Sequence, residues 1–243
     1  MKKVILKRGK EESLLRFHPW IFSGAIDRIE GAPEEGDLVD VYTSRGEWIA
    51  AGHIQVGSIA VRVLTFVNEP VDGNFWKKQL TIALNVRKTL GLTGRQDHNI
   101  FRLVHGEGDN LPGLVIDVYG HTAVMQAHSV GMHCCRMEIA NALKDVMGDM
   151  VTSIYYKSET TLPYKANVDR ENGYIIGGPV KDDVPLEYGM KMPVDWISGQ
   201  KTGLFIDQRE NRALLEKYSK GRNVLNMFCY TGGFSLAALS SNL

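Results

Sequence analysis

The sequence predicts a multidomain protein that combines α+β with α/β architecture. Three observations lead to this prediction. Short β-branched runs separated by turns fill residues 1–67, and helical and strand patterns mix between residues 75 and 185. Near residue 224, an apolar run then leads through a glycine turn into a helical pattern. We therefore divide the chain into domains 1–72, 73–185 and 186–243.

The composition is that of an ordinary globular protein. The 243 residues include 44% hydrophobic and 23% charged side chains, values that argue against disordered, collagen-like and coiled-coil classes. No apolar run reaches the roughly 18 residues of a membrane-spanning helix or the about 7–15 of a signal peptide core. Three cysteines are too few for a disulfide framework. We expect a soluble, cytoplasmic protein with no membrane partner.

Charge is distributed unevenly although its sum is zero. Residues 1–16 carry six basic and two acidic side chains, and the segment from Leu186 onward carries seven basic and five acidic ones. A neutral chain does not attract polyanions over its whole surface. Any nucleic-acid surface is therefore expected at the N-terminus or on the last segment.

Residues 1–72 are expected to form a small barrel, with strands over 4–6, 38–42, 48–54 and 59–66 at short spacing. The central domain is expected to begin with a helix over 75–91, followed by strands at 100–105, 113–119, 122–127 and 152–157. A second helix is expected over about 131–147, with Cys135, Ile139, Leu143 and Val146 as its apolar stripe. Residues 159–183 then suggest a hairpin and a linker.

The last domain changes character. Residues 184–195 are strand-like, and residues 199–203 form a polar, glycine-bounded loop. Asp207, with Glu210 three positions later, matches a capping box for a helix whose apolar face includes Ala213, Leu214 and Tyr218. Residues 224–228 are typical of a buried strand, and a second helix follows the next turn.

That turn, Thr231-Gly232-Gly233, is the first candidate binding site. Glycines allow close approach to the backbone, and the free amides of a helix N-terminus favour negative groups. The turn lacks the G-x-G-x-x-G pattern, so pyrophosphate binding is not supported. A plain strand-to-helix connection and a site for the carboxylate of an adenosyl cofactor both fit.

Four motifs in order resemble those of a bacterial S-adenosylmethionine-dependent large-subunit ribosomal RNA methyltransferase I family, whose best-known member methylates cytosine C5. They are RFHPWIFSGA at 16–25, RLVHGEGDNLPGL at 102–114, GQKTGLFIDQRENR at 199–212 and NMFCYTGGFS at 226–235. The resemblance implies a PUA-like β pseudo-barrel that binds RNA, a central α+β linking domain, and the start of a class I Rossmann-like methyltransferase domain. It also implies S-adenosyl-L-methionine as cofactor and ribosomal RNA as partner, and we keep a homodimer as a candidate assembly.

Carried over position by position, the resemblance predicts a cofactor site with two parts. The turn would contribute Phe228, Cys229, Tyr230, Thr231, Gly232 and Gly233, and the preceding loop and helix would contribute Gln200, Lys201, Thr202, Phe205, Asp207 and Arg209. Two alternatives stay open. Asp207 is either a helix cap or a ligand contact, and Arg209 and Arg212 either bind RNA phosphate or are solvated helix residues.

The catalytic residue is not among these positions. Cytosine C5 is a poor nucleophile, and the family's chemistry resembles covalent catalysis by a cysteine thiolate that adds at C6. The resemblance places that cysteine beyond residue 243, and Cys229 in the cofactor turn is a weak substitute. The pattern thus suggests a C-terminally truncated domain, and we expect chain 1–243 alone to be inactive. The alternative is a non-catalytic RNA-binding module made of the first two domains.

Other candidates carry less weight. Cys134, Cys135, His128 and His133 are metal-ligand types, but neighbouring helical residues point about 100° apart, so no metal site is predicted. Glu107 and Asp109 suggest a carboxylate pair, although a Gly-Glu-Gly-Asp-Asn stretch is typical of a turn. His18, Trp20 and Phe22 either stack on a base or fill the barrel core, and the core interpretation is favoured.

Overall fold

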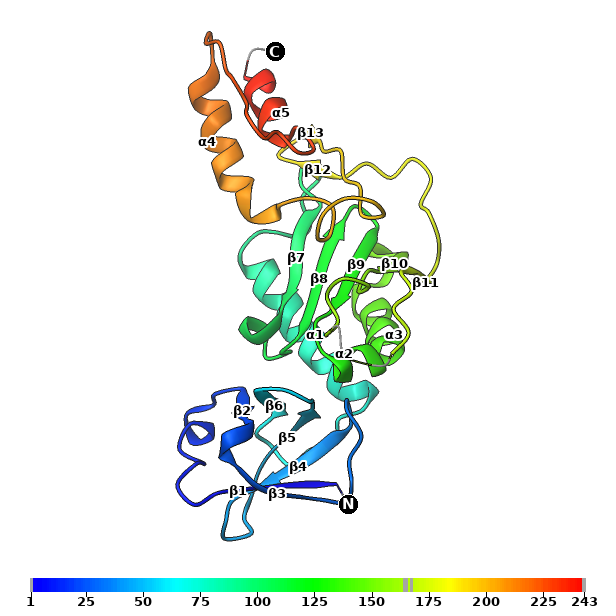
Figure 1. The fold of residues 1–243 in the computed structure, drawn as a ribbon. Helices are drawn as coiled ribbons and strands as arrows, with labels where there is room; N and C mark the ends of the chain where they lie inside the picture. Colours follow the sequence, from blue (N-terminus) through cyan, green and yellow to red (C-terminus); the bar gives the residue numbers. More distant parts are fainter. Residues whose placement is uncertain (1, 164–165, 167, 242–243) are drawn as a thin grey trace.

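The computed structural model describes residues 2–163, 166 and 168–241. Figure 1 shows three parts stacked along one axis, with the N-terminal sheet at one end and the orange and red C-terminal helices at the other. The central sheet lies between them. Within the described residues, no helix is both long and apolar enough to cross a bilayer.

The N-terminal part is a curled six-stranded sheet in the order β2-β6-β5-β4-β1-β3. Its strands are β1 (Lys3–Leu6), β2 (Trp20–Phe22), β3 (Ile26–Glu30), β4 (Leu38–Tyr42), β5 (Trp48–Ile54) and β6 (Ile59–Thr65). Only the β1–β4 pair is parallel among these neighbours. The four predicted strands are confirmed, and β2 and β3 are additional.

Alternating residues of these strands fill the interior of the curled sheet, which explains the period-two pattern in the sequence. At Gly52 a side chain would collide with the backbone carbonyl of Arg62 on the neighbouring strand. The close approach of β5 and β6 therefore requires glycine at this position.

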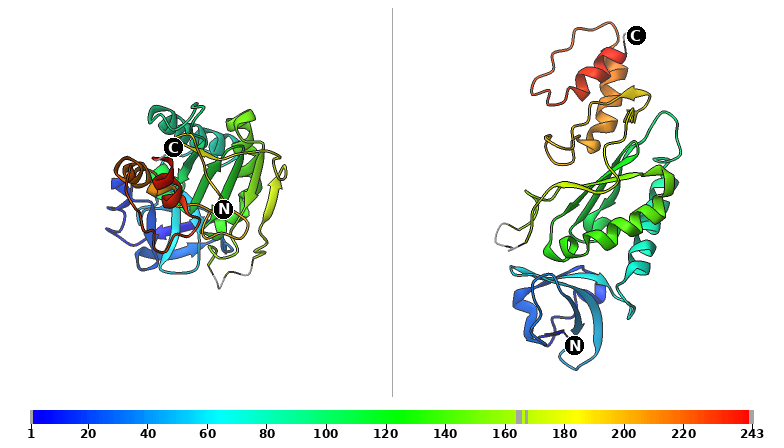
Figure 2. Two further views of the ribbon diagram at one scale, coloured as in Figure 1. Left: turned by 90° about the horizontal axis from the view of Figure 1, so that it is seen from above. Right: turned by 90° about the vertical axis from the view of Figure 1, so that its right-hand side faces the viewer.

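The central part is a mixed five-stranded sheet in the order β11-β10-β9-β8-β7. Its strands are β7 (Ile100–His105), β8 (Leu114–Tyr119), β9 (Thr122–Ala127), β10 (Ser153–Tyr156) and β11 (Gly173–Ile176). The parallel pair β9–β10 is joined through α2 (Val130–Cys134) and α3 (Arg136–Met147). Figure 2, right, shows α3 and α1 (Gly73–Thr89) on one face of this sheet.

Helix α1 begins two residues before its predicted start because Asp72 caps it. The Asp72 carboxylate accepts hydrogen bonds from the amides of Asn74 (2.9 Å) and Phe75 (3.1 Å). The predicted second helix is interrupted at Cys135, where α2 ends and α3 begins. Helix α2 packs against the N-terminal sheet. The two lie so close together at Gly131 that a side chain there would collide with the His53 ring. The interruption lets α3 follow the central sheet instead.

The last part contains the short hairpin strands β12 (Leu186–Glu187) and β13 (Met190–Lys191), and the helices α4 (Arg209–Ser219) and α5 (Gly233–Ser240). The expected strand over 184–195 is wrong in its extent. Tyr188 (φ 50°) and Gly189 (φ 82°) both adopt left-handed backbone conformations and reverse the chain.

The expected buried strand over 224–228 is also wrong for the described structure. No described strand pairs with it, and Leu225 and Phe228 are 84% and 99% exposed. An apolar run forms a buried strand only when neighbouring strands supply hydrogen bonds on its flanks. Helix α5 and the glycine turn before it form as predicted.

Helix α4 buries a different face from the predicted one. Leu214 and Tyr218 are exposed, whereas Arg212 and Ser219 are buried. The helix is preceded by a 3-10 turn over Ile206–Gln208, so Gln208 rather than Asp207 occupies the cap position, without a side-chain cap bond. The predicted capping box is therefore wrong.

Candidate functional site

The structure brings together two of the sequence motifs that are about thirty residues apart. The hydroxyl of Tyr230, in the glycine turn, accepts a hydrogen bond from the Gln200 amide at 2.7 Å. The Tyr230 ring also meets the Phe205 ring edge-on, with 5.4 Å between ring centroids. The loop 199–203 and the turn 229–233 thus lie side by side, as one candidate site requires.

The loop 199–203 is held on the central sheet by Thr202, which is buried. Its hydroxyl donates to Asp117 Oδ2 at 2.6 Å and lies 2.9 Å from the Tyr119 hydroxyl. The side-chain amide of Gln126 donates to the Lys201 carbonyl at 3.3 Å. Because side chains alternate along a strand, Asp117 and Tyr119 share the face of β8 opposite α1 and α3. The sheet therefore positions the loop.

Asp117 is the centre of this arrangement and has no solvent exposure. Arg102 on β7 donates to both of its carboxylate oxygens, at 2.8 and 2.9 Å. This hydrogen bonding raises the pKa of Arg102. Burial raises the pKa of the Tyr119 phenol, which stays protonated and able to donate. A buried carboxylate is stable here because a guanidinium and a hydroxyl both donate to it.

The remaining loop residues are more open. Gln200 and Lys201 are exposed, and the Lys201 ammonium lies 5.8 Å from the Phe205 ring centroid. Asp207 is exposed and accepts a bond from the Gln208 side chain at 3.2 Å, while Arg209 donates to Glu210 at 3.0 Å.

Asp207 and Arg209 line a groove of about 480 Å³ between α1, the end of β7 and the start of α4. Its other lining residues are Val86, Arg87, Leu90, Leu92, Arg102, His105, Gly108, Asp109, Ile206 and Glu210. None of the predicted turn residues from Phe228 to Gly233 lines this groove. The structure therefore separates the predicted site residues into two groups.

The turn residues lie close to α5. Phe228 and Cys229 are exposed, Thr231 is half-buried, and Gly232 (φ 79°) has open space where a side chain would be. Gly233 begins α5, and a side chain there would approach Met192 to 3.2 Å. The N-cap residue of α5, Gly232, has no side chain that could accept a hydrogen bond from the first-turn amides.

Arg212 takes neither role expected for it. It is 2% exposed, and it donates to both carboxylate oxygens of the fully buried Glu187 at 2.6 Å. The pair ties α4 to the β12–β13 hairpin. Four buried or half-buried polar residues of this arrangement, Glu187, Arg102, Asp117 and Tyr119, were not among the predicted site residues. The alternation of Leu114, Ile116 and Val118 with Asp117 and Tyr119 indicates a second buried face of β8.

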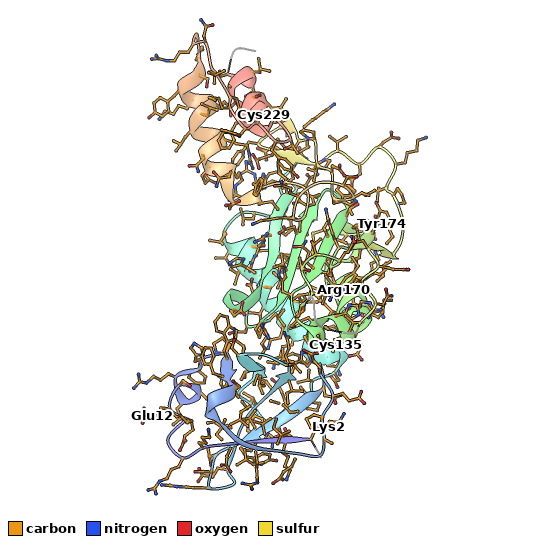
Figure 3. The ribbon with its side chains drawn as sticks, viewed as in Figure 1. Lys2, Glu12, Cys135, Arg170, Tyr174 and Cys229 are labelled. Atoms are coloured by element: carbon orange, nitrogen blue, oxygen red, sulfur yellow. The ribbon has the colours of Figure 1, made fainter. Side chains whose placement is uncertain are left out.

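The other polar candidates have structural partners. Arg87 donates to both oxygens of Asp109, and Trp20 donates to Glu107 at 2.9 Å. These two carboxylates therefore do not act as a pair. Cys135 lies 3.7 Å from His53 Nε2 at the junction of the first two parts, and Figure 3 shows it far from Cys229. Among the described residues, no group of three or more His, Cys, Asp or Glu side chains gathers as a metal site.

Fold and site together define a multidomain α/β protein with an N-terminal PUA-like domain, which a family model of that description matches over residues 4–66. A second family model, described as an S-adenosylmethionine-dependent methyltransferase, matches residues 102–242. This match covers more than half of the chain, and the chain belongs to that family. The predicted family and fold class are confirmed.

Curated relatives agree with this assignment. A protein of Erwinia tasmaniensis named Ribosomal RNA large subunit methyltransferase I is 38% identical over 99% of the chain and 60% of its own length. A protein of Tolumonas auensis with the same name is 42% identical over 97% of the chain and 59% of its own length. The chain thus spans about three fifths of the length of the curated relatives it matches.

Two solved structures share the fold at 22% sequence identity. One is a candidate SAM-dependent methyltransferase from Streptococcus mutans, with a TM-score of 0.79 over 99% of this chain and 61% of that one. The other is a candidate methyltransferase complexed with SAH, with a TM-score of 0.80 over 99% of this chain and 60% of that one.

Proposed function

We propose that the whole protein transfers a methyl group from S-adenosyl-L-methionine to large-subunit ribosomal RNA. The observation that carries this proposal is the similarity to the two relatives of that name over nearly the whole chain. The contact between Tyr230 and the Gln200 amide supports it, because it joins the two motifs expected to hold the cofactor. The comparisons give no support to a non-catalytic module.

For the cofactor site we propose the twelve positions expected from the motifs, in two parts: ten in the loop and the turn, and Asp207 and Arg209 in the groove beside α1. Gly232 leaves open space beside the backbone at the start of α5, and the first-turn amides of that helix suit the carboxylate of an amino-acid tail. The neighbouring rings of Phe205 and Tyr230 offer apolar surface to an adenosine. The remaining positions are Gln200, Lys201, Thr202, Asp207, Arg209, Phe228, Cys229 and Thr231. When bound, the cofactor supplies an electrophilic methyl group on a sulfonium.

We further propose cytosine C5 as the target and a nucleophilic cysteine outside residues 1–243. Burial raises the pKa of Cys135 to about 12 and also raises that of Cys134, so neither forms a thiolate readily. Both lie at the junction of the first two parts, and Cys229 lies in the cofactor turn. Methylation at C5 replaces the hydrogen on that carbon. RNA carrying tritium at cytosine C5 should therefore release it with one equivalent of methyl transferred, whereas transfer without release would exclude this target.

The activity of residues 1–243 alone is a separate proposal. We propose that they transfer no methyl group, because the segment 224–228 pairs with no described strand and Phe228 is 99% exposed. A cofactor turn without a strand to hold it is not preorganised. Purified 1–243 that methylates ribosomal RNA would contradict this proposal. The homodimer expected from the sequence also stays a prediction. Light scattering would test it by measuring the molar mass of the protein in solution.

A further inference from the structure

Three aromatic rings stand on the surface of the N-terminal sheet instead of in its interior. His18 is exposed, Trp20 is half-buried, and Phe22 is 49% exposed, while Ile21 between the last two is 2% exposed and joins the core. Neither Trp20 nor Phe22 belongs to the interior cluster of this sheet, which contains Ile21 between them, so both rings point away from the core. The core interpretation favoured for these rings is therefore wrong.

These rings form one cluster. Ring centroids lie 5.9 Å apart for His18 and Trp20, and 6.4 Å apart both for Trp20 and Phe22 and for His18 and Phe22. The indole of Trp20 donates to Glu107 at 2.9 Å, and the Trp20 amide donates to His18 Nδ1 at 3.2 Å. Two hydrogen bonds thus hold the cluster in place while its rings remain partly open to solvent.

A cationic side chain lies beside the cluster. Arg62 on β6 stands directly opposite Trp20 on β2, and it gives one hydrogen bond to Gln55 at 3.1 Å. A guanidinium has five donors, so Arg62 has donors left for a phosphate. Lys7 approaches from the basic N-terminal stretch, where its ammonium donates to the Gly24 carbonyl at 3.0 Å, two residues beyond Phe22.

A cavity lies next to these residues where the first two parts meet. It measures about 220 Å³ and is lined by Arg62, His105, Gly106, Glu107, Gly113, Leu114, Val115 and His128. Pockets for drug-sized molecules are roughly 300–1,000 Å³, so this one suits a smaller group such as a single nucleobase. Figure 1 shows β2 and β6 at the end of the N-terminal sheet that faces the central sheet.

We propose that His18, Trp20, Phe22 and Arg62 form a binding platform for an unpaired nucleotide of RNA. The rings stack on the base, Arg62 binds the adjoining phosphate, and the cavity behind Glu107 receives a neighbouring base. This inference rests on the proposed function and names the part of the chain that selects its substrate. Stacking on aromatic rings requires a base that is free of its helical partners, so the platform prefers single strands to duplexes.

The platform is tested by fluorescence anisotropy with residues 1–243 and a labelled oligocytidylate of about ten nucleotides, a length within the range of such sites. Phe22→Ala and His18→Ala should each weaken binding by roughly 5- to 100-fold, the loss of one stacked base. Phe17→Ala is the matched control, because Phe17 is 72% exposed and packs on Phe66 outside the cluster. Phe17→Ala should change the affinity for the oligocytidylate by no more than about twofold relative to the parent chain.

Arg62→Gln adds a readout that loss of folding would not imitate. Removing one phosphate contact should lower the slope of log affinity against log salt by about one. A labelled duplex of the same length should bind more weakly than the single strand. No binding of the single strand, equal losses in Phe22→Ala and Phe17→Ala, or an unchanged salt slope in Arg62→Gln would each overturn the platform.

Failure of this inference is distinguishable from failure of the proposed function. The whole protein should bind S-adenosyl-L-methionine with the same affinity in the parent chain and in Phe22→Ala, as measured by calorimetry, because Phe22 lies outside the proposed cofactor site. Intact cofactor binding with no single-strand binding would therefore refute the platform alone.

Discussion

The hydroxyl of Thr202 donates a hydrogen bond to the buried carboxylate of Asp117 at 2.6 Å, across 85 positions of sequence. This contact joins the polar loop of the last part to the second face of the central sheet. Arg102 neutralises the same carboxylate from the neighbouring strand. The loop is therefore positioned by the central domain, which gives that domain a role beyond linking its neighbours.

Thr202→Val should release the loop from the sheet. The substitution keeps the shape of the side chain but removes a donor to a buried carboxylate, which typically costs about 1–3 kcal/mol. The change should appear as faster amide hydrogen exchange in residues 199–206. Thr89→Val is the matched control, because the Thr89 hydroxyl bonds only a helix carbonyl at an exposed position. Equal exchange in both variants would contradict this role.

Tyr230→Phe should loosen the contact between the loop and the glycine turn. It removes the hydroxyl that accepts from the Gln200 amide, and one net hydrogen bond corresponds to roughly a 2- to 10-fold change in affinity. We expect that loss in S-adenosyl-L-methionine affinity of the whole protein, measured by calorimetry. Tyr218→Phe, at a side chain that is 64% exposed, should bind as the parent does. Unchanged affinity in Tyr230→Phe would remove this residue from the site.

Breaking the ion pair of Arg212 and Glu187 should free α4 from the hairpin. Glu187→Gln leaves a guanidinium that is 2% exposed without its counter-charge, a change that typically costs about 3–5 kcal/mol. Limited proteolysis should then cut the last part at lower protease concentration. Lys77→Met, which breaks the exposed pair with Asp145, should alter cleavage little. Resistance of Glu187→Gln to protease would contradict the anchoring role.

The junction of the first two parts should weaken in acid through His53. Burial lowers the pKa of His53 to about 4, whereas an unfolded histidine titrates near 6.5. The unfolded state therefore binds more protons between these values, and stability falls as the pH drops from about 6.5 to about 4, by roughly 3 kcal/mol in all. The neighbouring Cys135 stays neutral over this range, because burial raises its pKa to about 12.

Thermal unfolding of residues 1–243 at several pH values measures this effect. The melting temperature should decline over that window in the parent chain, and the decline should be shallower in His53→Gln, which has no titrating ring. An equally steep decline in His53→Gln would assign the acid sensitivity to other groups.

Much of the fold was predictable because its elements carry local patterns. Alternating apolar residues in β4 and β8 and three- and four-residue spacing in α1 each reflect one buried face. Strand β2 was missed because it is three residues long and its two outer residues are aromatic, one half-buried and one exposed. The close packing of Gly131 in the second helix on His53 joins residues that are distant in sequence, and no local pattern contains that information.

The candidate site was predictable only in part, for a similar reason. The motifs around Gln200 and Tyr230 were recognisable as sequence, and the structure brings those two residues into contact. The partners that hold the loop, Asp117 and Arg102, lie on strands β8 and β7. The sequence of these strands indicates that one face carries polar residues, but it does not indicate which loop packs on that face. The buried state of Arg212 was unpredictable, because its partner Glu187 lies in a hairpin whose turn depends on Tyr188 accepting a left-handed conformation.

The most direct test of the proposed function is methyl transfer by the whole protein. Large-subunit ribosomal RNA from cells that lack the protein should be incubated with it and S-adenosyl-L-methionine labelled in the methyl group. We expect label in the RNA that approaches one methyl group per molecule, and none when Gly233→Val blocks the turn against Met192. No label in the RNA with the parent protein, under conditions in which it binds the cofactor, would contradict the proposed function.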